Sequence, residues 1–336
     1  MLSLSFRAHV IPATILLAIL AHPAGAENIS GVEQIGDGNT AEVEQLNGFS
    51  SNNTSGIRQE GAGNSASVRQ DASPAEVSAT VEQVGDQNEA TVEQGGQMVF
   101  QTAIIHQAGT GNVVESMQSG FEGGSTLNAT QDGTGNRIGA QQQGFFGSNN
   151  AVIGQSGDAN EADLDQVGSF GSNMAGITQN GASNFAELSQ EAGEASNSAM
   201  LLQDGAGNQA VVSQRGFAGN NASSLTQLGD GNTAHIEQTS LFNSFQVGGD
   251  VGNDSAVMVT GNNNDTTVIQ NAGSGPMNFG FTGMNLSEVG VTGSGNTVSV
   301  SQTLHAGDTL DSGGNSSVVT VTGNGNSATV NQSFGP

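Results

Sequence analysis

Apolar and polar positions alternate along most of this chain in short runs of seven residues. In the run Asn39–Gln45 the first, third, fifth and seventh positions are Asn, Ala, Val and Gln, and the positions between them are Thr, Glu and Glu. Because successive side chains of a β-strand point to opposite faces, this period of two predicts a strand. We therefore expect the aliphatic residues to point inward together with the Asn and Gln, and the acids to point to solvent.

The run recurs at a nearly constant spacing, which is typical of a repeat fold. Twelve asparagines mark it, 24 or 25 residues apart up to Asn232 and then 32, 32 and 30 apart: Asn39, Asn64, Asn88, Asn112, Asn136, Asn160, Asn184, Asn208, Asn232, Asn264, Asn296 and Asn326. Glutamine stands six residues after each of them: Gln45, Gln70, Gln94, Gln118, Gln142, Gln166, Gln190, Gln214, Gln238, Gln270, Gln302 and Gln332. Glutamine also stands five residues before the first nine: Gln34, Gln59, Gln83, Gln107, Gln131, Gln155, Gln179, Gln203 and Gln227. Glycine stands three residues before all twelve: Gly36, Gly61, Gly85, Gly109, Gly133, Gly157, Gly181, Gly205, Gly229, Gly261, Gly293 and Gly323. A phase held over twelve units favours an ordered repeat over a disordered chain.

Most repeats contain the strand pattern twice. A second asparagine opens the additional copy at Asn28, Asn53, Asn149, Asn173, Asn197, Asn221, Asn253, Asn285 and Asn315. Glycine-containing turns such as Gly36–Gly38 separate the two copies and supply the positive φ angles of a tight reversal. Two strands and two turns then make one rung. The sequence predicts an all-β fold, a β-solenoid of twelve stacked two-strand rungs of the cross-β, amyloid-like kind.

The first 26 residues differ from the rest. Arg7 and His9 precede an apolar run from Val10 to Ala21 that Pro12 interrupts, and a small-residue segment ends at Ala26. This order of segments predicts a secretory signal peptide over 1–26, cleaved near Ala26. An apolar run of about 12 residues is too short to cross about 30 Å of hydrocarbon as a helix. We expect nine regular rungs over 27–238 and three variant rungs with longer wide turns over 239–336.

Inward asparagine and glutamine side chains require hydrogen-bond partners. A buried amide without one costs roughly 1–3 kcal/mol. Stacking identical amides in register solves this, because each side chain donates to one neighbouring rung and accepts from the other. We therefore interpret the repeated Asn and Gln as structural ladders and the repeated Gly as turn residues.

Composition removes several functions. The net charge is −26, from 31 Asp and Glu against 5 basic residues that are all Arg, and the chain has no Cys. Such a charge repels nucleic-acid phosphates, and the lack of Cys excludes disulfide frameworks and thiolate metal sites. Beyond residue 26 the histidines are His106, His235 and His305, without metal-ligand spacing, and no G-x-S-x-G, H-E-x-x-H or P-loop occurs. We predict neither catalysis nor a cofactor or metal.

The segment Gln34–Gln45 has the pattern Q-x-G-x-x-N-x-A-x-x-x-Q, and Gln83–Gln94, Gln155–Gln166, Gln179–Gln190, Gln203–Gln214 and Gln227–Gln238 match it equally well. This pattern resembles the curlin repeat of bacterial curli subunits, over essentially the whole chain after residue 26. The resemblance implies a secreted protein that polymerises with itself along the solenoid axis into an extracellular amyloid fibre at the cell surface, for adhesion and biofilm matrix. It also implies other curlin-like subunits and an outer-membrane secretion channel as partners.

The chain departs from the family pattern in three respects. It has twelve repeats where familiar curlin subunits have about five, and its first strand begins at Asn28, close to the expected cleavage site, which leaves the export route open. In the last three rungs Val259, Val291 and Val321 replace the first Gln.

Surface residues suggest how assembly is controlled. The rung edges carry no Lys and little Pro, so they lack two common devices against edge pairing. Outward acids slow premature assembly in one interpretation and form only a solvated face in the other: Glu33, Glu44, Glu82, Glu93, Asp163, Asp165 and Glu237. Phenylalanines in the wide turns either pack over the solenoid corner or form an apolar stripe: Phe49, Phe121, Phe145, Phe146, Phe170, Phe217, Phe242, Phe245, Phe279 and Phe281.

The main alternative function is a calcium-binding β-roll of the RTX type, a secreted adhesin module. Its G-G-x-G-x-D-x-U-x motif resembles the Gly-Asp-Gly turns, but Asn39 and its equivalents stand where calcium needs a carboxylate. An ice-binding solenoid is a third option, and it is disfavoured because the outward face is mixed and acidic rather than a flat array of Thr.

Overall fold

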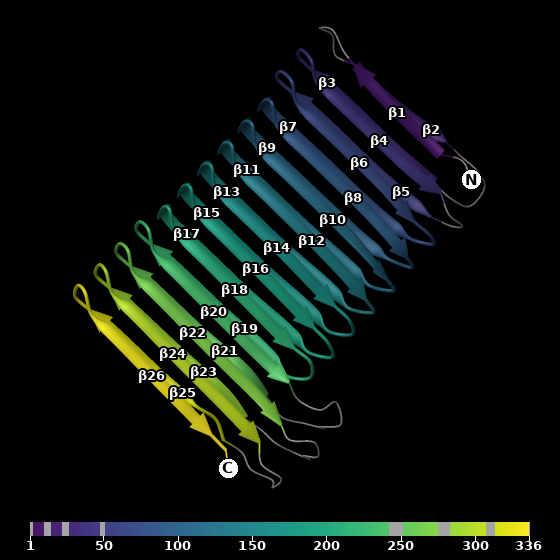
Figure 1. Cartoon of the computed structure of the whole chain (residues 1–336). Helices are drawn as coiled ribbons and strands as arrows, with labels where there is room; N and C mark the ends of the chain where they lie inside the picture. Colours follow the sequence, from purple (N-terminus) through teal and green to yellow (C-terminus); the bar gives the residue numbers. More distant parts are fainter. Residues whose placement is uncertain are drawn as a thin grey trace. The chain divides into compact units, whose positions relative to one another are not determined.

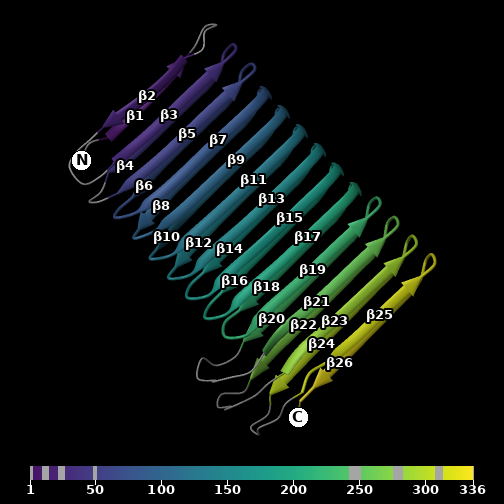
Figure 2. The same cartoon turned by 180° about the vertical axis from the view of Figure 1, so that it is seen from behind.

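The structure of the chain is a computed structural model (Figures 1 and 2), and it describes residues 3–9, 15–21, 27–47, 51–241, 251–274, 283–306 and 313–335. The chain divides into two units, Met1–Asp165 and Gln166–Pro336. In the described residues of both units the regular structure is entirely β. Each unit is a β-solenoid, because its strands alternate between two parallel sheets. The fold class predicted from the sequence is confirmed.

In the first unit one sheet contains the even-numbered strands β4 (Thr40–Asn47), β6 (Ser65–Ala72), β8 (Glu89–Gln97), β10 (Val113–Phe121) and β12 (Arg137–Phe145). The other contains β3 (Glu27–Ile35), β5 (Asn52–Glu60), β7 (Glu76–Asp86), β9 (Phe100–Thr110), β11 (Gly124–Thr134) and β13 (Ser148–Asp158). The division between the units falls inside β14 (Glu161–Gly168). We call these the even-strand and odd-strand sheets.

In the second unit the even-strand sheet contains β16 (Phe185–Ala192), β18 (Gln209–Gly216), β20 (Thr233–Leu241), β22 (Asp265–Ser274), β24 (Thr297–Ala306) and β26 (Ser327–Phe334). The odd-strand sheet contains β15 (Ser172–Ala182), β17 (Ser196–Ala206), β19 (Asn220–Leu228), β21 (Val251–Thr260), β23 (Gly283–Thr292) and β25 (Ser316–Thr322). One even and one odd strand therefore form each rung, as the sequence predicted.

Neighbouring strands of a sheet pair in parallel, and the repeat sets their register. Gln118 of β10 lies opposite Gln94 of β8 and Gln142 of β12, so identical positions of successive repeats are stacked. The seven-residue alternation appears directly as burial: in β18 Ala210, Val212 and Gln214 are buried between the sheets. The core is thin and is built from small residues, aliphatic residues and amides.

The first glycine of each tight turn is fixed by a close approach between rungs. Gly205 has a φ of +137°, and a Cβ atom there would overlap the carbonyl oxygen of Gly229 in the next rung. The second glycine of the same turn, Gly207, has a φ of +65° and open space around it. At the second position other turns hold residues such as Gln87 and Ala159 with positive φ. Only the first glycine is therefore required sterically, which explains its presence in every repeat.

We expect Gly205→Ala to lower the guanidinium midpoint of unfolding far more than Gly207→Ala. The alanine at 207 costs only about 1–2 kcal/mol for a left-handed residue, whereas the alanine at 205 must also separate two backbones. Equal shifts of the two midpoints would contradict this account of the turn.

The strands β1 (Ser3–His9) and β2 (Ile15–Ala21) lie within the predicted signal peptide. β1 pairs antiparallel with β4, and β2 pairs antiparallel with β3. All the described pairings between rungs are, in contrast, parallel. In the full-length chain β1 and β2 occupy the edge of the first rung, which the sequence had suggested to be open. The cleavage region, 22–26, lies outside the described residues.

Candidate assembly site: amide ladders and strand edges

A column of glutamines runs through the even-strand sheet of each unit. In the first unit Gln45, Gln70, Gln94 and Gln118 each donate from Nε2 to Oε1 of the next glutamine, at 2.8–2.9 Å. In the second unit the same bond links Gln166, Gln190, Gln214, Gln238, Gln270, Gln302 and Gln332 at 2.7–2.8 Å. The predicted ladder is therefore present, and every bond in it points toward the C-terminal rung.

The odd-strand glutamines form a second column with the same direction. It links Gln34, Gln59, Gln83, Gln107, Gln131 and Gln155 in the first unit, and Gln179, Gln203 and Gln227 in the second, at 2.7–2.9 Å. The column ends at Gln227, opposite Val259 of β21. Val259, Val291 and Val321 are all buried and follow one another in register. Three valines thus replace the ladder together, so no isolated amide is left between them.

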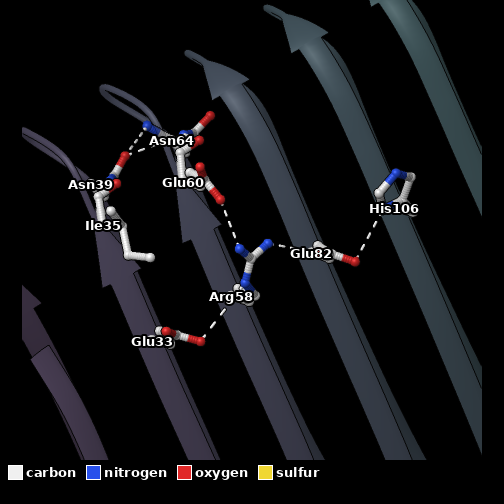
Figure 3. A network of polar contacts seen from close by, with 8 residues as sticks. All are labelled: Glu33, Ile35, Asn39, Arg58, Glu60, Asn64, Glu82 and His106. Carbon is white, nitrogen blue, oxygen red and sulfur yellow. Dashed lines mark hydrogen bonds and ion pairs between the residues drawn. The ribbon is translucent and has the colours of Figure 1, made fainter. Parts of the chain in front are cut away.

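The turn asparagines form a third column, with donation in the opposite direction. Asn64 donates both its backbone N–H and its Nδ2 to Oδ1 of Asn39, at 2.9 and 3.2 Å (Figure 3). Its Nδ2 also donates to the carbonyl of Gly85 at 2.7 Å. Each asparagine therefore ties its own rung to the turn glycine of the next one. The fixed three-residue interval from Gly to Asn in the sequence is the signal of this contact.

A fourth column consists of the additional asparagines of the odd strands. In the second unit Asn197, Asn221, Asn253, Asn285 and Asn315 each donate to the preceding asparagine at 2.9–3.1 Å. In the first unit Val77, Gln101 and Ser125 occupy its positions between Asn53 and Asn149. The column is therefore continuous only in the second unit.

The direction of donation makes the two ends of the ladders chemically different. At the first rung the buried acceptors Gln34 Oε1 and Gln45 Oε1 have no hydrogen-bond partner among the described residues, although β2 and β1 lie against them. β1 and β2 thus pair with this edge without giving the two amide oxygens a hydrogen-bond partner. At the last rung Gln332 already accepts from Gln302, and its Nε2 is bonded to the carbonyl of Ser316. One amide hydrogen of Gln332 therefore remains for a further rung.

The inward side chains of β26 are accessible, unlike those of the rungs before it. Asn296, Val298, Val300 and Gln302 of the preceding rung are 0–1% exposed. The equivalent residues of the last rung are more accessible: Asn326 is exposed, and Ala328, Val330 and Gln332 are only partly buried. A further strand of the same pattern, placed in register, would bury these side chains. It would also continue the column of even-strand glutamines and the column of turn asparagines.

The outer face of the odd-strand sheet in the first unit carries a line of charges (Figure 3). Arg58 contacts Glu60 and Glu82 at 2.7 Å and Glu33 at 3.8 Å, and His106 Nδ1 lies 3.3 Å from Glu82. The hydrogen bond to Glu60, followed by that to Glu82, raises the pKa of Arg58. These side chains are 38–48% exposed, so the ion pairs contribute little to stability.

The other arginines beyond residue 26 also bridge acids of adjacent rungs. Arg69 contacts Glu44, Arg137 contacts Glu115 and Arg215 contacts Glu191, at 2.9–3.3 Å. The seven outward acids predicted from the sequence all lie on outer faces, at least partly accessible. Their effect on assembly stays a prediction.

Asp254 on β21 is an acid of the second unit whose ionised form is disfavoured by burial. It lies between Ala222 and Leu286 in register, and burial raises its pKa above the ordinary value. A raised pKa in the folded chain means that the ionised form is disfavoured there. The penalty is absent below the unfolded pKa, near 4, and is complete once the pH exceeds the folded value.

We therefore expect Asp254→Asn to raise the guanidinium midpoint at neutral pH and to leave it unchanged near pH 3, where the aspartate is already protonated. Unfolding of wild type and variant at the two pH values measures this difference. A gain in midpoint that is equal at both would show that the burial of charge is not its cause.

The phenylalanines of the wide turns partly pack on one another. Phe121, Phe145 and Phe146 form a cluster with ring centroids 4.8–5.6 Å apart. Phe145, Phe146, Phe170 and Phe217 nevertheless remain 42–63% exposed. Packing and an exposed apolar surface thus occur together. Phe49, Phe242, Phe245, Phe279 and Phe281 lie outside the described residues.

The arrangement offers backbone and amide hydrogen bonding along the strand edges. Among the described residues no group of three or more His, Asp or Glu is placed to hold a metal ion. His106 and His235 lie on outward positions of different units, each near a glutamate. Within the same part of the chain, no helix has the length and apolarity to span a membrane.

These features define a class of protein, the β-solenoid whose rungs are joined by buried amide ladders. Residues 195–229 match the family model of the curlin associated repeat. Within this segment the chain carries the curlin repeat. The matched segment spans β17, β18 and β19, with Gln203, Asn208, Gln214 and Gln227 in their ladder positions. A search of curated proteins found no match to the chain.

Proposed function

We propose that this chain, after removal of its signal peptide, is a secreted curli-like subunit that polymerises head to tail into an extracellular fibre for adhesion and biofilm matrix. The observation that carries the proposal is the accessible inward face of β26, whose counterparts in the earlier rungs are buried. Association of two strand edges in register restores backbone pairing, side-chain burial and amide bonding together. No catalytic role enters the proposal.

The polarity of the ladders favours one mode of joining. Gln332 retains an amide hydrogen at one edge, and Gln45 offers an unpaired Oε1 acceptor at the other. Contact of unlike edges is a heterologous interface, and such an interface gives an open filament when it does not close into a ring. For the glutamine columns, contact of like edges would place donor against donor at one end and acceptor against acceptor at the other.

The experiment uses purified residues 27–336 at micromolar concentration, with and without preformed seeds. We expect a lag, its loss on seeding, binding of an amyloid dye, and fibres by electron microscopy. A protein that stays monomeric and never binds the dye contradicts the proposal. In cells, deletion of the gene should remove surface fibres, and a secretion channel and other curlin-like subunits are the partners to test there.

Assembly should accelerate at acid pH and at high salt. The chain carries a net charge of −26, so approaching copies repel one another at neutral pH and low salt. Protonation removes this charge, and about 1 M salt shortens the Debye length to about 3 Å. Dye-binding kinetics over pH and salt measure the effect, and rates indifferent to both would show that the outward acids are only a solvated face.

A further inference from the structure

Over three successive rungs of the second unit, the outer faces of the two sheets differ sharply in charge. In the second unit the segments 172–178, 196–202 and 220–226 of β15, β17 and β19 contain no ionisable residue. On the even strands of the same rungs, outward positions hold Glu187, Glu191, Arg215 and Glu237. We call the outward side of the three odd-strand segments the uncharged face.

The uncharged face combines exposed apolar side chains with small polar ones. Met174 and Met200 are 60% and 69% exposed. In register, Met174 lies opposite Ser198, and Met200 lies between Gly176 and Ser224. Long side chains thus lie beside short ones. Such an uneven surface lets the side chains of two facing sheets interdigitate at a separation of about 10 Å. Glu194 and Asp204 flank the face at the wide and tight turns, both exposed.

The same contrast occurs in the first unit, considered by itself. The segments 124–131 of β11 and 148–157 of β13 contain no ionisable residue, and Val152 is 60% exposed there. The even strands β10 and β12 of these rungs carry Glu115 and Arg137. An uncharged stretch of the odd-strand face therefore occurs in both units, whereas β5 and β7 of the first unit carry Arg58 and Glu82 and β21 of the second carries Asp254.

We infer that the uncharged face is where a second copy of this chain, in a neighbouring fibre, packs side by side. This inference rests on the proposed polymerisation. Charge selects the occupant, because a chain with a net charge of −26 repels its own copies except where no charges face each other. Stacking of the even-strand faces would instead bring Glu187, Glu191 and Glu237 against their equivalents.

The size of the face indicates when this contact forms. Three strands about 4.8 Å apart, each with about four outward positions, cover roughly 350 Å². A stable pair of proteins buries about 800 Å² per partner, so single chains would not hold together through this surface. In a fibre the face recurs with every subunit, and the second and later contacts form at high effective concentration. Lateral pairing therefore follows polymerisation and does not precede it.

The test compares Met200→Glu and Ser198→Glu on the uncharged face with Gln209→Glu, which adds the same charge on the outward side of β18. All three side chains are exposed, so the fold of the single chain should be unaffected. Dye-binding rates report elongation, and electron microscopy reports the fraction of fibres that lie paired or bundled.

We expect the two variants of the uncharged face to elongate like the wild type, with roughly tenfold fewer paired fibres because each subunit adds one repulsive contact. Gln209→Glu should bundle like the wild type. The inference is overturned if Met200→Glu and Ser198→Glu fibres bundle normally, or if Gln209→Glu separates fibres equally well. Failure of the proposed function has a different result, which is the absence of fibres from the wild-type protein.

Discussion

Replacing Val330 with lysine should stop the mature protein from extending fibres while leaving the single chain folded. Val330 occupies an inward position of β26 and is partly accessible, whereas Val300 and Val268 in the rungs before it are fully buried. A lysine there can reach solvent in the single chain. In the fibre it would be enclosed between two rungs without a counter-ion. The cost is about 3–5 kcal/mol for each subunit added, or roughly 10²–10⁴-fold in the elongation equilibrium.

Thr329→Lys is the matched control, because Thr329 is the neighbouring residue of β26 and points outward. It should extend fibres like the wild type. Val330→Lys should also slow wild-type growth when added in small amounts, since it can join through its first rung and then present a blocked edge. Seeded dye-binding assays and electron microscopy measure both effects. If the Val330→Lys protein elongates fibres at the wild-type rate, β26 is excluded as a joining edge.

Much of this fold is predictable because the repeat encodes it twice, as alternation within a strand and as phase between rungs. Asn, Gln and Gly each fall at a fixed interval, so one correct rung defines all the others. The steric need for the first turn glycine, such as Gly205, is likewise present in the sequence as its strict recurrence. Local pattern and tertiary contact agree here, which is the condition under which sequence reasoning succeeds.

The direction of amide donation was not predictable. A ladder of Gln is equally well bonded in either direction, and the carbonyl oxygens that accept the second N–H, such as that of Ser198 for Gln214, set the choice. The line of charges around Arg58 was also missed, because its members are 24 or 25 residues apart and look like isolated surface residues. The asymmetry between the two outer faces emerges only after the strands are assigned to sheets.

The low apolar content of the chain is explained by the same geometry. Each rung buries few aliphatic side chains, and the cohesion between rungs comes from backbone pairing and amide columns. Such a structure is tolerant of change on its surface and sensitive to change within a column. The three valines that replace glutamine together in the second unit illustrate the rule, since removing all partners of a buried polar group is far cheaper than removing one.

A valine in the middle of a column should therefore be much more damaging than a valine at its end. Gln203 accepts a hydrogen bond from Gln179 at 2.9 Å and donates to Gln227 at 2.9 Å and to the carbonyl of Phe185 at 3.0 Å. Gln203→Val removes the ladder partner of two groups, the Nε2 donor of Gln179 and the Oε1 acceptor of Gln227. Gln227→Val, at the end of the column, removes an acceptor from Gln203 alone. Each variant also loses one bond to a backbone carbonyl, so this term cancels in the comparison.

At about 1–3 kcal/mol for each unmet buried group, Gln203→Val should cost roughly twice as much as Gln227→Val, about 2–6 against about 1–3 kcal/mol. The guanidinium concentration that dissociates preformed fibres measures both variants on one scale. The double variant provides the sharper comparison: once Gln203 is valine, adding Gln227→Val removes an acceptor that is already unmet and should restore part of the loss. Additive losses in the double variant would show that the ladder bonds do not act as a column, and that valine is tolerated at 259, 291 and 321 for another reason.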